Sequence, residues 1–218
     1  MSSKFIIIRV LLFVLLVVGT TSAMIAQDND FTTWTKFKVN HKIDSRFAVS
    51  GDLELRTEDD MSAIDRWGIS VGGDYRAFSF LKFEIGYETH YRNLGEIGWK
   101  FRHRYRIGAT ASFRYQWLKM SLRERFQQTF DRGESETRLR SRLKLGYAPQ
   151  KGIVSPYFSI EICQSLDDAP FWRTARLRYR PGIEIDLTKR WSLDAFYCYQ
   201  YESSRGKHIA GVEVGYSF

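Results

Sequence analysis

The sequence predicts an all-β fold, an antiparallel up-and-down transmembrane β-barrel preceded by a cleaved N-terminal signal peptide. Three observations predict it. The chain starts with basic residues and a short apolar run, the remainder alternates apolar and polar residues with a period of two, and no later stretch is apolar enough for a transmembrane helix. A strand with lipid on one face and a polar lumen on the other needs that alternation.

Residues 1–26 are expected to form the signal peptide. Lys4 and Arg9 supply its positive flank, and an apolar run and then small residues follow. This order of charge, apolar core and small residues is typical of a secretory signal. Cleavage after Ala26 is favoured, and cleavage after Ala23 is the alternative. The uninterrupted apolar run is much shorter than the ~20 residues of a spanning helix, so a permanent anchor is disfavoured.

Residues 27–218 are expected to form one domain, because no linker or low-complexity tract interrupts them. The whole chain has a formal net charge of +8, and it stays basic without the signal. A basic excess is typical of nucleic-acid binding, but an exported chain rarely meets nucleic acid. We therefore expect no nucleic-acid partner.

Eleven segments of the mature chain show the alternation, and the first of them is the weakest. One face of the fourth segment, for example, is apolar or aromatic (Leu81, Phe83, Ile85, Tyr87, Tyr91), and the other is polar. The segments cover roughly residues 31–40, 47–56, 67–76, 81–92, 99–113, 117–130, 137–147, 154–164, 172–187, 191–202 and 207–218. Each is expected to form a strand.

The connections between these segments are expected to alternate in length. Short turns are predicted near residues 42–44, 77–80, 114–116, 149–152 and 188–190. Longer polar loops are predicted near residues 57–65, 93–98, 131–136, 165–170 and 202–207. Short turns on one rim and longer loops on the other are typical of outer-membrane barrels, with the longer loops outside the cell.

The count of eleven conflicts with the even strand numbers of bacterial single-chain barrels. A further short strand near residues 27–32 would give twelve strands. Alternatively, residues 31–40 are not a full member of the barrel, which leaves ten. The sequence predicts 10 or 12 strands and does not choose between them.

Aromatic residues indicate which face meets lipid. A soluble barrel would hold its apolar face inside, but the apolar face here carries more bulk than a small barrel interior accepts. Tryptophans also stand at strand ends, where an aromatic girdle is expected at each membrane interface. Three of them follow longer loops and two follow short turns: Trp67, Trp99 and Trp172, then Trp117 and Trp191.

The C-terminal segment agrees with this interpretation. Tyr216 and Phe218 end a run with apolar residues at alternate positions. Such an ending resembles the signal that the barrel-assembly machinery reads. The expected location is therefore the cell outer membrane, with outer-membrane lipid and the barrel-assembly machinery as partners.

The opposite face of the strands is strongly charged, and an arginine facing the bilayer midplane would cost ~2–4 kcal/mol. A basic stripe is predicted in the lumen at Lys100, Arg102, Arg104, Arg106, Arg123, Arg125, Arg138, Arg140, Arg142, Arg176, Arg178 and Arg180. An acidic wall is predicted at Asp52, Glu54, Asp74, Glu84, Glu88, Glu161, Glu184 and Asp194.

These charges allow two interpretations. In the favoured one, the basic and acidic walls pair across a narrow lumen and largely plug a non-enzymatic barrel of unassigned activity. In the alternative, the basic stripe guides anions through a narrow anion-preferring channel or holds them in a solute-binding barrel. The partner would then be a small anionic solute.

A second alternative is a lipid-modifying outer-membrane hydrolase, which would use serine and histidine with a polar third residue. The histidines are His41, His90, His103 and His208. By their odd or even positions in the alternation, His103 and His208 face outward. His90 faces inward near Glu88, without a recognisable nucleophile. Histidine and cysteine do not cluster. We therefore assign no catalytic residue, no metal ligand and no cofactor.

Cys163 and Cys198 both project inward by parity, on strands with one strand between them. Adjacent strands lie about 4.8 Å apart, so the two α-carbons should be about 10 Å apart. A disulfide allows only about 7 Å. We expect free thiols.

Glu124 departs from the alternation. By parity it falls on the lipid face, between Leu122 and Phe126. A β-bulge, or an approach of the strand to the headgroup level, is expected to account for it.

Several segments together resemble a known family. They are Leu122–Phe130 (LRERFQQTF), Thr137–Tyr147 (TRLRSRLKLGY), Ser155–Tyr157 (SPY) and Arg178–Glu184 (RYRPGIE). They resemble the domain of unknown function 2490 family, outer-membrane barrel proteins of Bacteroidetes, over nearly all of the mature chain. The resemblance implies an outer-membrane barrel, and it implies no activity and no functional residues.

Overall fold

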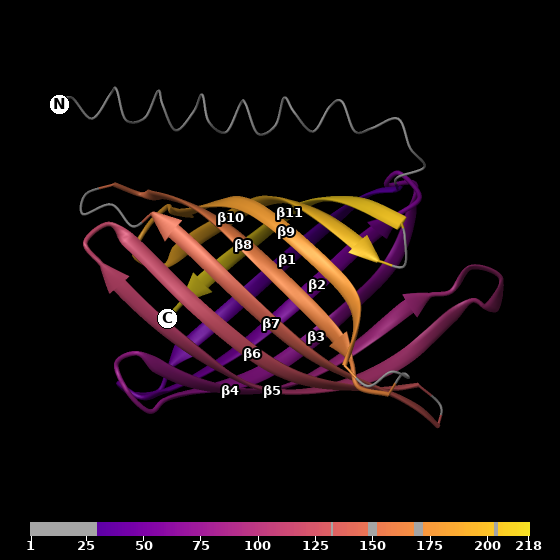
Figure 1. Ribbon diagram of the computed structural model, residues 1–218, viewed down its shortest axis with the longest axis horizontal. Coiled ribbons are helices and arrows are strands. Elements are labelled where there is room, and N and C mark those ends of the chain that lie inside the picture. Colours follow the sequence, from indigo (N-terminus) through magenta and orange to yellow (C-terminus); the bar gives the residue numbers. More distant parts are fainter. Residues whose placement is uncertain (1–29, 132, 148–151, 168–171, 203–204) are drawn as a thin grey trace.

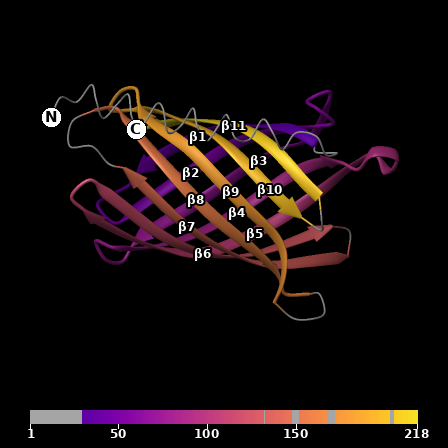
Figure 2. The same ribbon diagram turned by 45° about the horizontal axis from the view of Figure 1, so that its top comes forward.

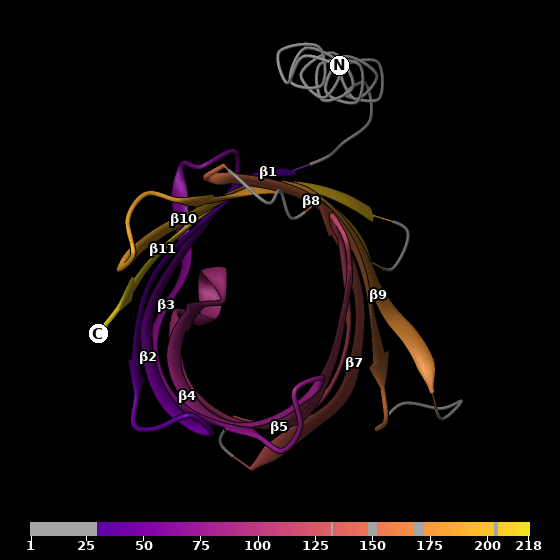
Figure 3. The ribbon, with the colours of Figure 1, turned by 90° about the vertical axis from the view of Figure 1, so that its left-hand side faces the viewer.

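The alternating segments form the strands of one closed barrel. A computed structural model describes residues 30–131, 133–147, 152–167, 172–202 and 205–218, and these residues form eleven strands. The strands cross the barrel obliquely in side view and form a complete ring when seen from one end (Figure 1 and Figure 3). The predicted signal peptide and both cleavage positions lie outside the described residues.

The strand bounds extend most of the predicted segments by a few residues. The strands are β1 (Asp30–Lys42), β2 (Phe47–Glu58), β3 (Ala63–Arg76), β4 (Leu81–Asn93), β5 (Trp99–Tyr115), β6 (Leu118–Asp131), β7 (Glu134–Tyr147), β8 (Val154–Ser165), β9 (Arg173–Asp186), β10 (Trp191–Glu202) and β11 (Arg205–Ser217). A short 3-10 helix, η2 (Gly95–Ile97), lies between β4 and β5. Within the described residues, no helix is long and apolar enough to cross a membrane.

Each strand pairs antiparallel with the next, and β1 closes the barrel by pairing parallel with β11. The closing register runs from Asp30 opposite Lys207 to Asn40 opposite Ser217. The prediction of 10 or 12 strands is therefore wrong. With an odd number of alternating strands, the first and last run in the same direction, and a parallel ladder joins them. Since β2 and β11 occupy both edges of β1, no further strand fits beside it.

Because β1 and β11 run in the same direction, the start of β1 and the end of β11 lie at opposite rims. We call the rim where β1 begins the N-terminal rim, and the rim where β11 ends the C-terminal rim; the latter lies at the label C in Figure 1 and Figure 2. The N-terminal rim carries the connections 59–62, 94–98, 132–133, 166–172 and 203–204. The C-terminal rim carries the connections 43–46, 77–80, 116–117, 148–153 and 187–190.

The predicted contrast between short turns and longer loops is wrong for these rims. Two of the expected long loops are the shortest connections of the N-terminal rim, because the flanking strands keep pairing to Asp131 opposite Glu134 and to Glu202 opposite Arg205. Backbone ladders need no apolar side chains, so polar residues at a strand end extend a hairpin as readily as they form a loop.

The turn between β1 and β2 shows how a polar residue fixes a connection. The Asp44 carboxylate accepts hydrogen bonds from the backbone N–H groups of Arg46 and Phe47, at 2.6 and 2.7 Å. Aspartate commonly stabilises turns in this way. These bonds hold the pKa of Asp44 below its usual value.

The two faces of the strands differ in the sense opposite to that of a soluble protein. Large apolar side chains such as Val71, Ile85 and Ile107 point outward and are more than half exposed. Charged side chains such as Glu161 and Arg178 point inward and are buried. This placement contradicts the soluble-barrel alternative, which required the apolar face inside.

A small apolar cluster lies inside the barrel where β1, β10 and β11 meet. Phe196, Cys198 and Ile209 are buried there, and Trp34 packs against them. The Trp34 ring also carries the guanidinium of Arg56 at 3.8 Å from its centroid. Parity puts Trp34 and Phe196 on the polar face of their strands, so the interior is not wholly polar.

Gly211 lets β11 approach this cluster, and its replacement tests the packing. A Cβ at Gly211 would lie only 1.9 Å from Cζ of Phe196. We expect Gly211→Ala to lower the free energy of unfolding by about 1–3 kcal/mol, because the ring must leave its position. At Gly146 the nearest atom to a Cβ is 3.5 Å away, so Gly146→Ala should stay within about 0.5 kcal/mol. Urea unfolding measures both, and equal losses would contradict this packing.

Candidate functional site

Two cavities lie among the inward side chains. The larger has a volume of about 650 Å³ and is lined by residues near the C-terminal rim, such as Arg114, Lys119 and Ser155. The smaller has a volume of about 350 Å³ and is lined by residues nearer the N-terminal rim, such as Arg92 and Glu202. We call them the large cavity and the arginine cavity. They share no lining residue.

Between the cavities, the lumen is filled by a network centred on Glu161 of β8. Its carboxylate accepts hydrogen bonds from Arg140 at 2.6 Å, Arg178 at 2.8 Å and Arg123 at 3.2 Å. Glu161 is only 4% exposed. A buried carboxylate is tolerated when it is paired and hydrogen-bonded in this way.

A second group of ion pairs and hydrogen bonds lies on β2 to β5. Arg104 donates to Glu88 at 3.0 Å, and Ser70 donates to Asp52 at 2.5 Å. Arg106 reaches both carboxylates at 3.8 Å. With the Glu161 network and the apolar cluster, these groups form the mid-lumen plug.

Among the described residues, the ion pairs form along the wall and do not cross the lumen. Arg125 of β6 pairs with Glu84 of β4 at 2.5 Å, and Lys144 of β7 pairs with Glu184 of β9 at 2.5 Å. Each pair links strands that have one strand between them. The expectation that opposite walls would pair across a narrow lumen is therefore wrong. Long side chains reach a partner at the next strand but one before they reach the far wall.

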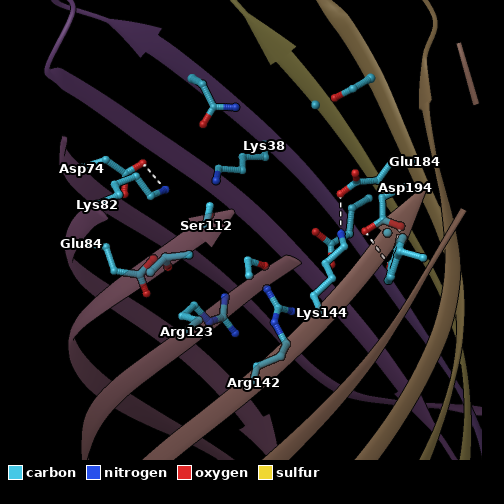
Figure 4. A pocket seen from close by; sticks show the side chains of 18 of the residues that line it. Lys38, Asp74, Lys82, Glu84, Ser112, Arg123, Arg142, Lys144, Glu184 and Asp194 are labelled. Carbon is cyan, nitrogen blue, oxygen red and sulfur yellow. Dashed lines mark hydrogen bonds and ion pairs between the residues drawn. The ribbon is translucent and has the colours of Figure 1, made fainter. Parts of the chain in front are cut away.

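The large cavity has a mixed lining (Figure 4). Asp74 pairs with Lys82 at 3.3 Å, and the Lys144 pair faces it from the other side. Arg142 lies beside Arg123, its cross-strand neighbour. Among the described residues, Arg142 makes no ion pair.

Nine of the fourteen residues that line the arginine cavity are arginines. Its lining consists of Arg56, Arg66, His90, Arg92, Arg102, Arg104, Gln127, Glu136, Arg138, Arg140, Cys163, Arg176, Arg178 and Glu202. The arginines come from six strands, β2, β3, β4, β5, β7 and β9. This convergence is the strongest concentration of one charge in the described part of the lumen.

The structure divides the predicted basic stripe between the two cavities. Arg102, Arg104, Arg138, Arg140, Arg176 and Arg178 line the arginine cavity. Arg106, Arg123, Arg125 and Arg142 line the large cavity. Arg180 pairs with Asp194 at 2.8 Å and Glu213 at 3.1 Å, and Lys100 lines neither cavity.

The predicted acidic wall divides in a similar way. Asp74, Glu84, Glu184 and Asp194 line the large cavity. Asp52, Glu54, Glu88 and Glu161 pair with basic side chains between or beside the cavities. Sequence reasoning did not include Arg56, Arg66 and Arg92 in the basic stripe, although Arg56 and Arg92 share its parity. Arg66 preceded the predicted start of its strand.

The five tryptophans predicted to form a girdle all lie exposed near strand ends. Trp67, Trp99 and Trp172 lie toward the N-terminal rim, and Trp117 and Trp191 lie at the C-terminal rim. The predicted assembly signal adjoins the last of these. Trp191 packs on Tyr216 with ring centroids 4.8 Å apart, and Tyr216 packs on Phe218 at 4.9 Å.

The histidines give no support to a hydrolase. His103 and His208 lie outward, and each ring bonds a tyrosine hydroxyl at 2.5 Å, from Tyr87 and Tyr197 respectively. His90 is buried in the lumen, 3.3 Å from a Glu88 oxygen. Over the described ranges, no serine hydroxyl bonds a histidine.

Two further sequence expectations are answered by the structure. Cys163 and Cys198 are free and buried, as expected. Glu124 lies at the middle of β6, and neither neighbouring ladder has a register shift there. A bulge and an approach to the headgroups are therefore both wrong as explanations. Instead, the Ser141 hydroxyl on β7 donates to the Glu124 carboxylate at 2.6 Å.

Comparisons with known proteins found a family match and similar solved structures. The family described as "Protein of unknown function (DUF2490)" matches residues 31–209. No curated protein matches the chain. Among solved structures, the translocator domain of the autotransporter NalP from Neisseria meningitidis is similar, with 16% sequence identity and a TM-score of 0.49. The match covers 78% of this chain and 73% of that one.

Proposed function

This chain belongs to the DUF2490 family, and on that premise we propose that it is an integral outer-membrane β-barrel without enzymatic activity whose lumen is plugged at mid-height. The observation that carries the proposal is the inversion of the two faces. Apolar side chains cover the outside of a closed barrel, and charged side chains fill its inside. A closed barrel leaves no backbone edge unpaired, which is what lipid demands.

The outer face supports lipid as its environment. Ile69, Ile85 and Ile107 lie in the middle of adjoining strands and are each more than half exposed. Large contiguous apolar surfaces are rare on monomeric proteins in water. Tryptophan at both rims suits the two membrane interfaces. The barrel-assembly machinery is the proposed partner of β11, through Tyr216 and Phe218.

The mid-lumen plug supports a barrel without an open pore. Glu161 and Arg178 are less than 10% exposed although both face the lumen. Trp34 adds an aromatic ring to the plug, with the Arg178 guanidinium 5.0 Å from its centroid. Side chains just fill an eight-stranded barrel, so a barrel of eleven strands needs groups of this kind to close its lumen.

Conductance tests this function directly. We expect the mature barrel, refolded and inserted into a planar lipid bilayer, to give no stepwise current in potassium chloride, whereas a water-filled porin measured in parallel does. Stable steps with anion selectivity would overturn the plug and favour the narrow anion channel. Failure of the protein to insert into bilayers would overturn the membrane assignment itself.

A further inference from the structure

The arginine cavity has a strong excess of positive lining. Nine arginines line it, with only Glu136 and Glu202 as acidic lining residues. The large cavity, by contrast, mixes nine lysine and arginine side chains with six acidic ones. Five further carboxylates pair with the arginines of the arginine cavity from outside its lining, namely Glu54, Asp65, Glu88, Asp131 and Glu161. The arginines still outnumber the carboxylates, so an anion is attracted to this cavity.

Several donors at this cavity are buried without a partner. The Nε–H groups of Arg138 and Arg140 and the Nε2 atom of His90 are inaccessible to solvent and make no hydrogen bond within the described structure. The remaining guanidinium nitrogens of Arg140 are used, one by Glu161 and one by Gln127 at 3.1 Å. Buried donors without acceptors are rare in native proteins and call for an explanation.

The pairing of the arginines leaves single terminal nitrogens at the cavity without a partner among the described residues. Arg138 pairs with Glu136 through one terminal nitrogen, and Arg104 uses Nε for Thr129 and one terminal nitrogen for Glu88. A guanidinium has five donors in a planar fork that suits phosphate and carboxylate oxygens. Forks that converge from six strands match a tetrahedral group better than a planar one, because its oxygens point in several directions.

We propose that the arginine cavity binds a compact phosphate-bearing anion with at least two negative charges. Its volume of about 350 Å³ admits a small molecule and excludes a polymer. Arg66 and Arg56 would meet it from one side, and Arg138 and Arg140 from the other. The phosphate belongs either to a soluble solute or to a lipid headgroup entering from the N-terminal rim.

Calorimetric titration of the refolded mature barrel in zwitterionic detergent tests this site. The probes are sodium pyrophosphate, and micelles doped with phosphatidic acid for the lipid source. We expect saturable one-to-one binding of one probe, which identifies the source, and none of chloride at equal ionic strength. Absence of saturable binding for both probes would overturn the proposal.

Conservative variants locate the binding. Arg138→Lys and Arg140→Lys keep the charge and remove the planar guanidinium fork, so each should weaken binding by about tenfold. Arg142→Lys is the matched control, because Arg142 lies on the same strand and lines the other cavity. The affinity of the Arg142→Lys barrel for the probe should stay within about twofold of that of the unaltered barrel. Equal weakening in Arg142→Lys and Arg138→Lys would place the anion elsewhere and overturn the site.

A measurement on the unaltered barrel covers the case in which a variant does not fold. Ligand binding to the folded state raises the unfolding temperature. Pyrophosphate or phosphatidic acid should raise it, and sodium chloride at equal ionic strength should not. No rise with either probe would count against the site. Binding is measured in detergent and conductance in a lipid bilayer. A failure of the proposed anion site is therefore distinguishable from a failure of the proposed function.

Discussion

Replacing Glu161 by glutamine should lower the free energy of unfolding by about 3–5 kcal/mol, the cost of breaking a buried ion pair from one side. The carboxylate accepts hydrogen bonds from Arg123, Arg140 and Arg178 and is almost inaccessible to solvent. Glutamine keeps the size of the side chain but leaves three guanidinium groups without the neutralising charge. Urea unfolding of the refolded barrel, followed by tryptophan fluorescence, measures the loss.

Glu184→Gln is the matched control for this variant. Its side chain is 41% exposed, and within the described residues its ion pair is with Lys144 alone. A partly exposed pair contributes about 1 kcal/mol or less. If the two variants lost equal stability, Glu161 would not be the central acceptor of the plug.

An arginine placed on the outer face should be nearly as costly. Ile107 lies at the middle of β5, points outward and is 59% exposed. We expect Ile107→Arg to lower the free energy of unfolding in lipid bilayers by about 2–4 kcal/mol, because the midplane cannot solvate the charge. Reversible unfolding from phospholipid vesicles in guanidinium chloride measures this difference.

Thr110→Arg supplies the comparison from the same strand. Thr110 lines the large cavity, where water and carboxylates can receive the new charge. The expected loss is about 1 kcal/mol or less. A larger loss at Thr110 than at Ile107 would mean that the faces are assigned the wrong way round.

The orientation of side chains could be predicted because it depends on local sequence. Successive residues of a strand point to opposite faces. The apolar set and the charged set of each strand can therefore be told apart without knowledge of the fold. Arg104, Arg106 and Arg125 face the lumen for this reason, and Ile107 faces outward. The same parity places Cys163 and Cys198 inside on strands too far apart to bridge.

The closure of the barrel could not be predicted in this way. No residue of β1 marks its parallel pairing with β11, which lies at the far end of the sequence. The hydrogen-bonding register between β1 and β11 decides the closure, because the other edge of each strand is already paired. The alternation marks eleven segments, and the structure shows that the expectation of an even number does not hold for this barrel.

The division of the lumen also escaped sequence reasoning, because it depends on packing among strands. Trp34 and Phe196 interrupt the polar face, and Gly211 admits the Phe196 ring. Arg66 enters the arginine cavity from a residue that precedes the predicted strand. Charge alone indicated a basic lumen, but only the arrangement of bulky residues divides it into two cavities.

The assignment of lipid to the outer face is tested most directly by spin labels along β5. Single cysteines at positions 104–110, in a background with Cys163 and Cys198 replaced by alanine, carry the label in proteoliposomes. Labels at Tyr105, Ile107 and Ala109 should collide with oxygen, which concentrates in lipid, and labels at the even positions should not. Oxygen accessibility that is highest at the even positions, or that does not alternate, would contradict the barrel described above.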